Sequence, residues 1–89
     1  MKKKPSPKSK NKIQRKIVLF FIENEGSIDT PRGISTWVNE SVPAVLRALE
    51  DLVKGGVLKA HRISSTVGYS SKHSKHGLSE VLRESYPSS

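Results

Sequence analysis

The sequence contains no cysteine, only one methionine and one tryptophan, and just 34% hydrophobic residues in a chain of 89. Without thiols, neither a disulfide framework nor a thiolate metal site can hold the fold together. A chain of this length has room for one small domain with a marginal core, because it buries only about 60% of the surface that it exposes when unfolded. We therefore expect packing, and association with a second copy, to supply its stability.

Long apolar runs are missing as well. The longest, at residues 17–22, is followed by Glu23, Asn24 and Glu25. A secretory signal needs an apolar core of about 7 to 15 residues with a small-residue cleavage site, and a membrane-spanning helix needs about 20 apolar residues. The sequence therefore predicts a cytoplasmic protein that makes no contact with a membrane.

The motifs that carry catalysis are absent too. There is no GxSxG, no HExxH, no glycine-rich phosphate loop, and no acidic residue in an apolar setting that would raise its pKa. His61, His73 and His76 raise the question of a metal site, but three imidazoles would have to converge from a hairpin and a tail without help from a cysteine or an acidic residue between them. We expect no enzyme activity, metal site, cofactor or small-molecule substrate.

Positive charge is what the sequence has in excess: 16 lysines and arginines stand against 8 aspartates and glutamates, a formal net charge of +8. Residues 1–16 hold eight of the basic residues and no acidic one, so residues 17–89 balance at eight against eight. An excess confined to one end indicates a polyanionic partner rather than a particular fold.

Residues 1–11 are expected to form a flexible basic arm, because they are rich in lysine, proline and serine and contain Met1 as their only apolar residue. Mobile lysine-rich segments follow a nucleic-acid backbone or enter a minor groove. The alternative interpretation is a solubilising tail. The candidate contacts of this arm are Lys2, Lys3, Lys4, Lys8 and Lys10.

Hydrophobic periodicity predicts three helices, a β-hairpin and a short fourth helix. Asn11, Thr30 and Ser41 are capping residues in front of periodic segments, and Pro31 suits a first helical turn. The helices are expected at 12–25, 31–38, 42–54 and 75–86, and the hairpin strands at 57–63 and 66–69. The chain then divides into a basic arm at 1–11, a folded domain at 12–72 and a tail with a short helix at 73–89.

The helix over 42–54 has the clearest amphipathic pattern in the chain. Its core residues are expected to be Val42, Val45, Leu46, Leu49, Leu52 and Val53. Trp37 is expected on the buried side of the preceding helix, as a core residue rather than a platform that stacks on bases.

The expected fold class is mainly α (α+β), with a three-helix core, a two-stranded β-hairpin wing and a short C-terminal helix. Two short helices joined by a tight turn and followed by a hairpin make a winged helix-turn-helix, which places one helix in a DNA major groove about 12 Å wide. Residues 30–70 resemble the winged helix-turn-helix of MarR- and ArsR-type transcriptional regulators. The matching positions are Ile34, Val38, Val45, Arg47, Leu49, Leu52, Gly56, Val57 and Leu58. The resemblance implies this fold and DNA binding, although winged helices also dock proteins.

The outward face of the helix over 42–54 is the candidate surface for reading bases. Arg47 suits a bidentate contact with guanine and Ala44 a contact with a thymine methyl, while nearby hydroxyls can reach phosphates or bases. Glu50 and Asp51 on the same face would be repelled by phosphates, and the alternative interpretation is a solvated charged surface. The candidate DNA contacts are Thr36, Ser41, Pro43, Ala44, Arg47, Lys54, Lys59, His61, Arg62 and Lys72.

Residues 52–79 contain no acidic residue. A cationic stretch on a hairpin and its exit is suited to phosphate contact or to minor-groove insertion, and the alternative is a basic surface without a nucleic-acid partner. The basic residues and histidines of this stretch are Lys54, Lys59, His61, Arg62, Lys72, His73, Lys75 and His76.

These features predict a small transcriptional regulator that binds duplex DNA at the nucleoid as a homodimer. The helix over 12–25 and the C-terminal helix are expected to form the dimer interface, because both have spare apolar residues. These residues are Val18, Leu19, Ile22, Leu78, Val81, Leu82 and Tyr86. One alternative is a docking or accessory module of an enzyme complex, since residues 48–72 also resemble the small winged-helix D protein associated with dissimilatory sulfite reductase. Another is a non-specific architectural nucleoid protein.

Overall fold

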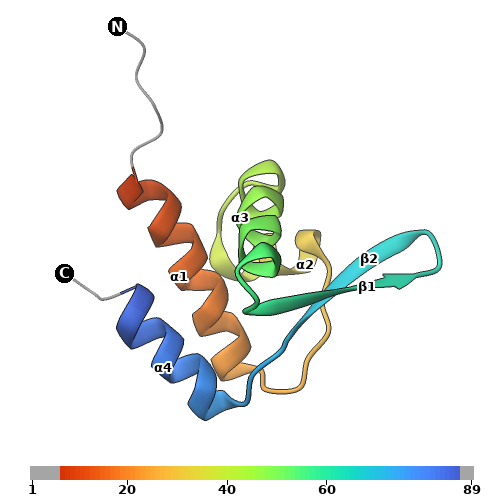
Figure 1. Cartoon of the computed structure of the whole chain (residues 1–89). Helices are drawn as coiled ribbons and strands as arrows, with labels where there is room; N and C mark the ends of the chain where they lie inside the picture. Colours follow the sequence, from red (N-terminus) through yellow and green to blue (C-terminus); the bar gives the residue numbers. More distant parts are fainter. Residues whose placement is uncertain (1–6, 87–89) are drawn as a thin grey trace, which may run out of the picture.

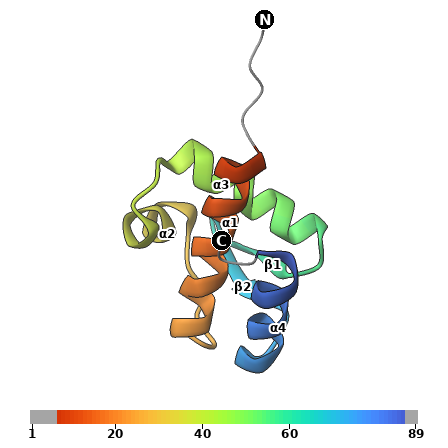
Figure 2. The ribbon, with the colours of Figure 1, turned by 90° about the vertical axis from the view of Figure 1, so that its left-hand side faces the viewer.

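The computed structural model describes residues 7–86, and their side chains from residue 12 onward. In chain order the elements are α1 (Pro7–Glu23), α2 (Pro31–Val38), α3 (Val42–Lys54), β1 (Leu58–Ile63), β2 (Thr66–Ser71) and α4 (Lys75–Ser85). The fold is α+β, with β1 and β2 paired as a two-stranded antiparallel sheet. Figure 1 shows this hairpin extending away from the helices, and Figure 2 shows α2 and α4 on opposite sides of α1.

Local capping chemistry sets the ends of α2 and α3 where the sequence predicts them. The backbone N–H of Gly33 donates to Thr30 Oγ1 at 3.2 Å, and that of Ala44 donates to Ser41 Oγ at 3.3 Å. Asn39, at φ 60° and ψ 48°, ends α2 in the left-handed conformation that asparagine tolerates. The predicted hairpin and fourth helix are confirmed to within two residues at each boundary.

α1 begins earlier than the sequence predicts. A helix over 12–25 capped by Asn11 was expected behind a flexible arm, but Asn11 lies inside α1. Pro7 suits a first helical turn, lysine is a good helix former, and extending a helix that apolar residues already nucleate costs little. Residues 7–11, which were expected to belong to the arm, are therefore the first part of α1. Two of the candidate contacts of the arm, Lys8 and Lys10, lie in α1. The other three lie outside the described residues: Lys2, Lys3 and Lys4.

The hairpin register places neighbouring residues on two faces. Leu58 and Tyr69 are buried and belong to the inner face. Because directly opposed residues share a face, Arg62, opposite Val67, lies on the inner face, whereas Lys59 lies on the outer one. A segment before α2 continues the sheet, since the backbones of Asp29 and Tyr69 exchange two hydrogen bonds of 3.1 and 2.8 Å. These bonds fix the base of the hairpin next to the start of α2.

The core lies where the helices meet the base of the hairpin. Every element except β2 contributes a fully buried side chain: Ile17, Val18, Phe21, Ile34, Val45, Leu49, Leu52, Leu58 and Leu78. Gln14 is the buried polar side chain among the described residues, at 7% exposure. No described helix is both long enough and apolar enough to cross a membrane.

Three side chains predicted in the core are exposed. Trp37 is 48% exposed and makes an edge-on contact with Phe20, with ring centroids 5.2 Å apart. Val42 and Leu46 are 40% and 36% exposed, whereas Ala48, which the predicted stripe omits, is buried. The buried stripe of α3 is rotated toward that alanine and consists of Val45, Ala48, Leu49 and Leu52, on a helix that packs against α1, α2 and β1.

α4 packs against α1 of the same chain (Figure 1). Val18 and Leu78, which were predicted at a dimer interface, are 0% and 1% exposed within one chain, so that prediction is wrong for these two residues. Tyr86 Oη donates to Gln14 Oε1 at 2.6 Å, and Gln14 Nε2 donates to Asp51 Oδ2 at 3.3 Å. One buried amide in α1 thereby connects α3 with the end of α4.

Candidate nucleic-acid interface

The outward face of α3 presents a row of exposed side chains. Pro43, Arg47, Glu50 and Lys54 follow one another by three or four residues, which places them on one side of the helix. All four are exposed, whereas Ala44 is half-buried at the edge of the row. Arg47 is exposed in the middle of this row, so its side chain can reach a partner.

The two acidic residues of α3 point in different directions. Asp51 is half-buried and accepts a hydrogen bond from Gln14 of α1, so it is turned away from the outward face. Glu50 is exposed and close enough to Tyr69 of β2 to raise the pKa of the phenol, although burial of that phenol raises it more. Of the two predicted repulsive groups, Glu50 therefore stays on the outward face, toward the base of the hairpin.

Two candidate hydroxyl groups are exposed but have different hydrogen-bonding capacity. Ser41 Oγ accepts from the Ala44 N–H, so its own hydrogen remains to be donated. Thr36 Oγ1 donates to the carbonyl of Arg32 at 3.2 Å. Because a phosphate oxygen only accepts hydrogen bonds, Ser41 is the better suited of the two to contact a DNA backbone.

The cations of the hairpin lie on both of its faces. Lys59 is exposed on the outer face and Arg62 on the inner one. His61 is half-buried, and its Nε2 lies 2.7 Å from Ser70 Oγ on the neighbouring strand. Lys72 is exposed just beyond β2. The structure thus brings three of the predicted basic residues and histidines together on one hairpin and leaves Lys72 at its base.

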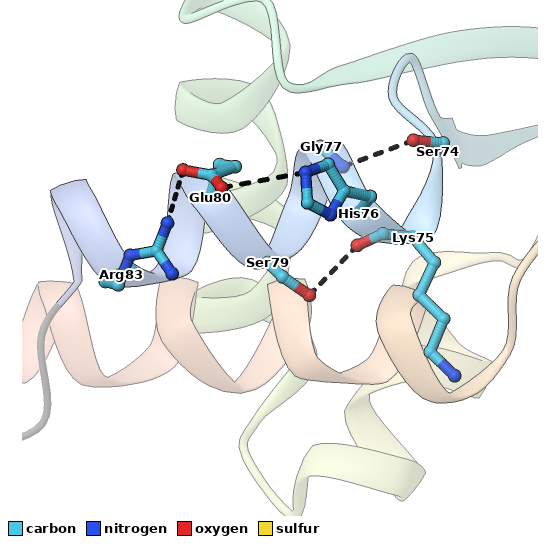
Figure 3. Close-up of polar contacts among 7 residues, drawn as sticks. All are labelled: Ser74, Lys75, His76, Gly77, Ser79, Glu80 and Arg83. Atoms are coloured by element: carbon cyan, nitrogen blue, oxygen red, sulfur yellow. Dashed lines mark hydrogen bonds and ion pairs between the residues drawn. The ribbon is translucent and has the colours of Figure 1, made fainter.

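The histidines of the tail lie near and within α4. His76 Nε2 lies 3.7 Å from one oxygen of Glu80, and the other oxygen of Glu80 accepts a 2.5 Å hydrogen bond from Arg83. Figure 3 shows Glu80 between these two side chains. The hydrogen bond and charge of Arg83 hold the pKa of Glu80 below its usual range. In the same view the Lys75 ammonium points away from this group. His73 precedes α4 in the chain and is exposed. Within residues 12–86, no three histidine or acidic side chains gather where they could hold a metal ion.

Three further exposed side chains were not among the contacts predicted from the sequence. Val42 and Leu46 lie one helical turn apart on α3, and Arg32 is exposed on α2. Ala48 was the signal in the sequence for the exposure of Val42 and Leu46. It lies three residues after Val45, so including it in the buried stripe moves that stripe away from Val42 and Leu46.

No protein-family model, curated protein or solved structure matches the chain.

Proposed function

We propose that this protein binds double-stranded DNA as a winged helix-turn-helix, with α3 in the major groove and the β1–β2 hairpin against phosphates. The element order supports this, since α2, a turn at 39–41, α3 and a hairpin follow one another as they do in that fold. The observation that carries the proposal is the exposure of Arg47 in the middle of α3, followed by a hairpin that has no acidic residue. The resemblance to MarR- and ArsR-type regulators favours a transcriptional role at the nucleoid.

Attraction to phosphates would come mainly from the hairpin and its flanks. Residues 52–79 carry five lysines and arginines and no acidic side chain. Because Lys59 and Arg62 lie on opposite faces, a hairpin placed along a groove would offer one cation to each wall. Each phosphate contact releases condensed counterions, so the logarithm of the affinity should fall with the logarithm of the salt concentration by about 0.9 per contact.

A homodimer is part of the proposal, through a smaller surface than the sequence indicates. Two of the predicted interface residues are covered inside one chain, and the others are half-buried: Leu19, Ile22, Val81, Leu82 and Tyr86. A twofold dimer would present two copies of α3 to two half-sites. Sedimentation of the full chain, alone and with duplex, measures whether this surface associates.

The proposal is tested by fluorescence polarisation with mixed-sequence duplexes of about two helical turns, at about 50 and 200 mM salt. Selection from a random duplex pool then supplies a preferred sequence. Arg47→Ala should weaken binding to that sequence by about 1–3 kcal/mol and relax the preference at one base position. Arg83→Ala is the matched control, because this arginine is exposed but paired with Glu80 on α4.

Two results would count against the proposal in different ways. Equal losses on every sequence for Arg47→Ala would remove base readout and leave a non-specific architectural protein. No salt-dependent affinity of the unaltered chain for any duplex would remove DNA binding.

A protein-docking module is the second candidate, and one observation favours it. The outward side of α3 includes aliphatic Val42 and Leu46 and acidic Glu50. A surface of this mixed composition suits a protein partner better than a uniformly basic surface would. Such a module would show weak affinity for DNA with a shallow salt dependence, which the same titration measures.

A further inference from the structure

The outward side of α3 has an aliphatic edge that the described elements cover only in part. Val42 is 40% exposed and Leu46 is 36% exposed. They are four residues apart on one helix, so their side chains lie on the same side of it, about 5–6 Å from each other at Cβ. Burying them against a partner would be favourable, because exposed aliphatic surface gains free energy when it leaves water.

The same side of the helix offers two other kinds of chemistry. Around α3, the aliphatic edge is followed by Glu50 and then by the cations Arg47 and Lys54, all exposed. A surface that places aliphatic, carboxylate and guanidinium groups side by side matches the groups along a major groove. Guanine presents acceptors, cytosine an amino donor and thymine a methyl group, and the methyl is the one apolar group there.

We infer that Val42 and Leu46 contact the 5-methyl groups of thymines in the major groove and make the protein selective for thymine beside the base that Arg47 reads. This inference rests on the proposed DNA binding. It replaces Ala44 as the methyl contact, because Ala44 is half-buried and lies at the opposite edge of the row, on the side where Asp51 meets α1. The cations of α3 and of the hairpin supply the attraction that brings this aliphatic edge to a polyanion.

The test removes the methyl groups and leaves the rest of the DNA unchanged. The duplex enriched from the random pool is synthesised twice, once with thymidine and once with deoxyuridine at the same positions. The two duplexes have the same phosphates and the same hydrogen-bonding groups. Affinities for both are measured by fluorescence polarisation with one preparation of the full chain, so any unfolded fraction cancels in their ratio.

The unaltered chain should bind the thymidine duplex more tightly by about fourfold for each methyl contacted, the equivalent of burying one methylene group. Leu46→Ala and Val42→Ala should each lower this ratio, and the double variant should bring it close to one. Ile63→Ala is the matched control, because Ile63 is an aliphatic residue of similar exposure, 45%, on the hairpin rather than on α3. It should leave the ratio unchanged.

Equal affinity of the unaltered chain for the two duplexes overturns the inference and leaves the proposed function standing. A ratio that survives the double variant, or that falls equally in Ile63→Ala, also overturns it. Failure to enrich or bind any duplex removes the proposed function itself, with the aliphatic edge then assigned to a protein partner.

Discussion

At the residue scale, the pKa values of the two tyrosines depend on burial and on nearby acidic residues. Burial raises the pKa of Tyr69, and the nearby charge of Glu50 raises it further. Burial and the charge of Asp51 do the same for Tyr86. Both carboxylates belong to α3, so the negative charges of one helix raise the pKa values of two phenols, one on β2 and one at the end of α4.

Because both pKa values are raised, the folded chain keeps phenol protons that the unfolded chain loses at a pH of about 10. This contribution to stability is fully present below that pH and is lost as the pH rises through the folded pKa values. Tyrosinate absorbance of the folded protein should therefore appear at higher pH than in the urea-unfolded chain. Tyr86→Phe leaves one transition, that of Tyr69. A folded-state titration at the ordinary value would show that neither phenol is buried as described.

At the element scale, the hairpin is a two-sided cationic ribbon attached at its base to α2 and α3. The Asp29–Tyr69 bridge holds one side of that base, and the turn at Ser64 (φ 54°) and Ser65 reverses the chain with two small residues. Lys59 and Arg62 are then held on opposite faces by register alone.

The position of these two cations predicts their effect on the salt dependence of duplex binding. If the hairpin lies in a groove, Lys59→Ala and Arg62→Ala should each reduce the slope of log affinity against log salt by about 0.9, and the double variant by about 1.8. Ser65→Ala on the same hairpin is the neutral control. A slope that changes for one face alone would show that the hairpin lies flat on a single strand.

At the scale of the whole molecule, Gln14 connects three helices. It is 7% exposed, accepts from Tyr86 at 2.6 Å and donates to Asp51 at 3.3 Å. A second polar link joins Lys16 of α1 to Glu40, which follows α2, with Lys16 Nζ 2.7 Å from Glu40 Oε2. Polar bonds near a small core fix how the helices are placed, because a buried amide is costly when its partners move away.

Removing the Gln14 amide should therefore lower the free energy of unfolding more than removing one of its two hydrogen bonds. We expect Gln14→Ala to lower the free energy of unfolding by about 2–3 kcal/mol and Tyr86→Phe by about 1 kcal/mol, measured by urea titration. Lys12→Ala, an exposed position on the same helix, should change it by less than about 0.5 kcal/mol. Equal, small changes in all three variants would mean that apolar packing alone holds α4 in place.

Much of the fold could be predicted because its signals are local. Thr30, Pro31 and Ser41 lie directly beside the helices that they start, and Asn39 beside the turn that it makes, so the bounds of α2 and α3 are correct to the residue. Local signals failed at α1, where Asn11 reads as a cap but a helix that continues through it satisfies the backbone equally well.

The sequence by itself determined the order of elements, the acid-free hairpin and the outward position of Arg47, since each depends on neighbouring residues or on counting charges. Only the tertiary structure decided that Trp37, Val42 and Leu46 are exposed, that Asp51 turns to Gln14, and that α4 covers Val18. Periodicity shows that a helix has an apolar side but not how far its neighbours extend over that side. Exposure depends on contacts between segments distant in the chain, and those are settled only when the helices pack.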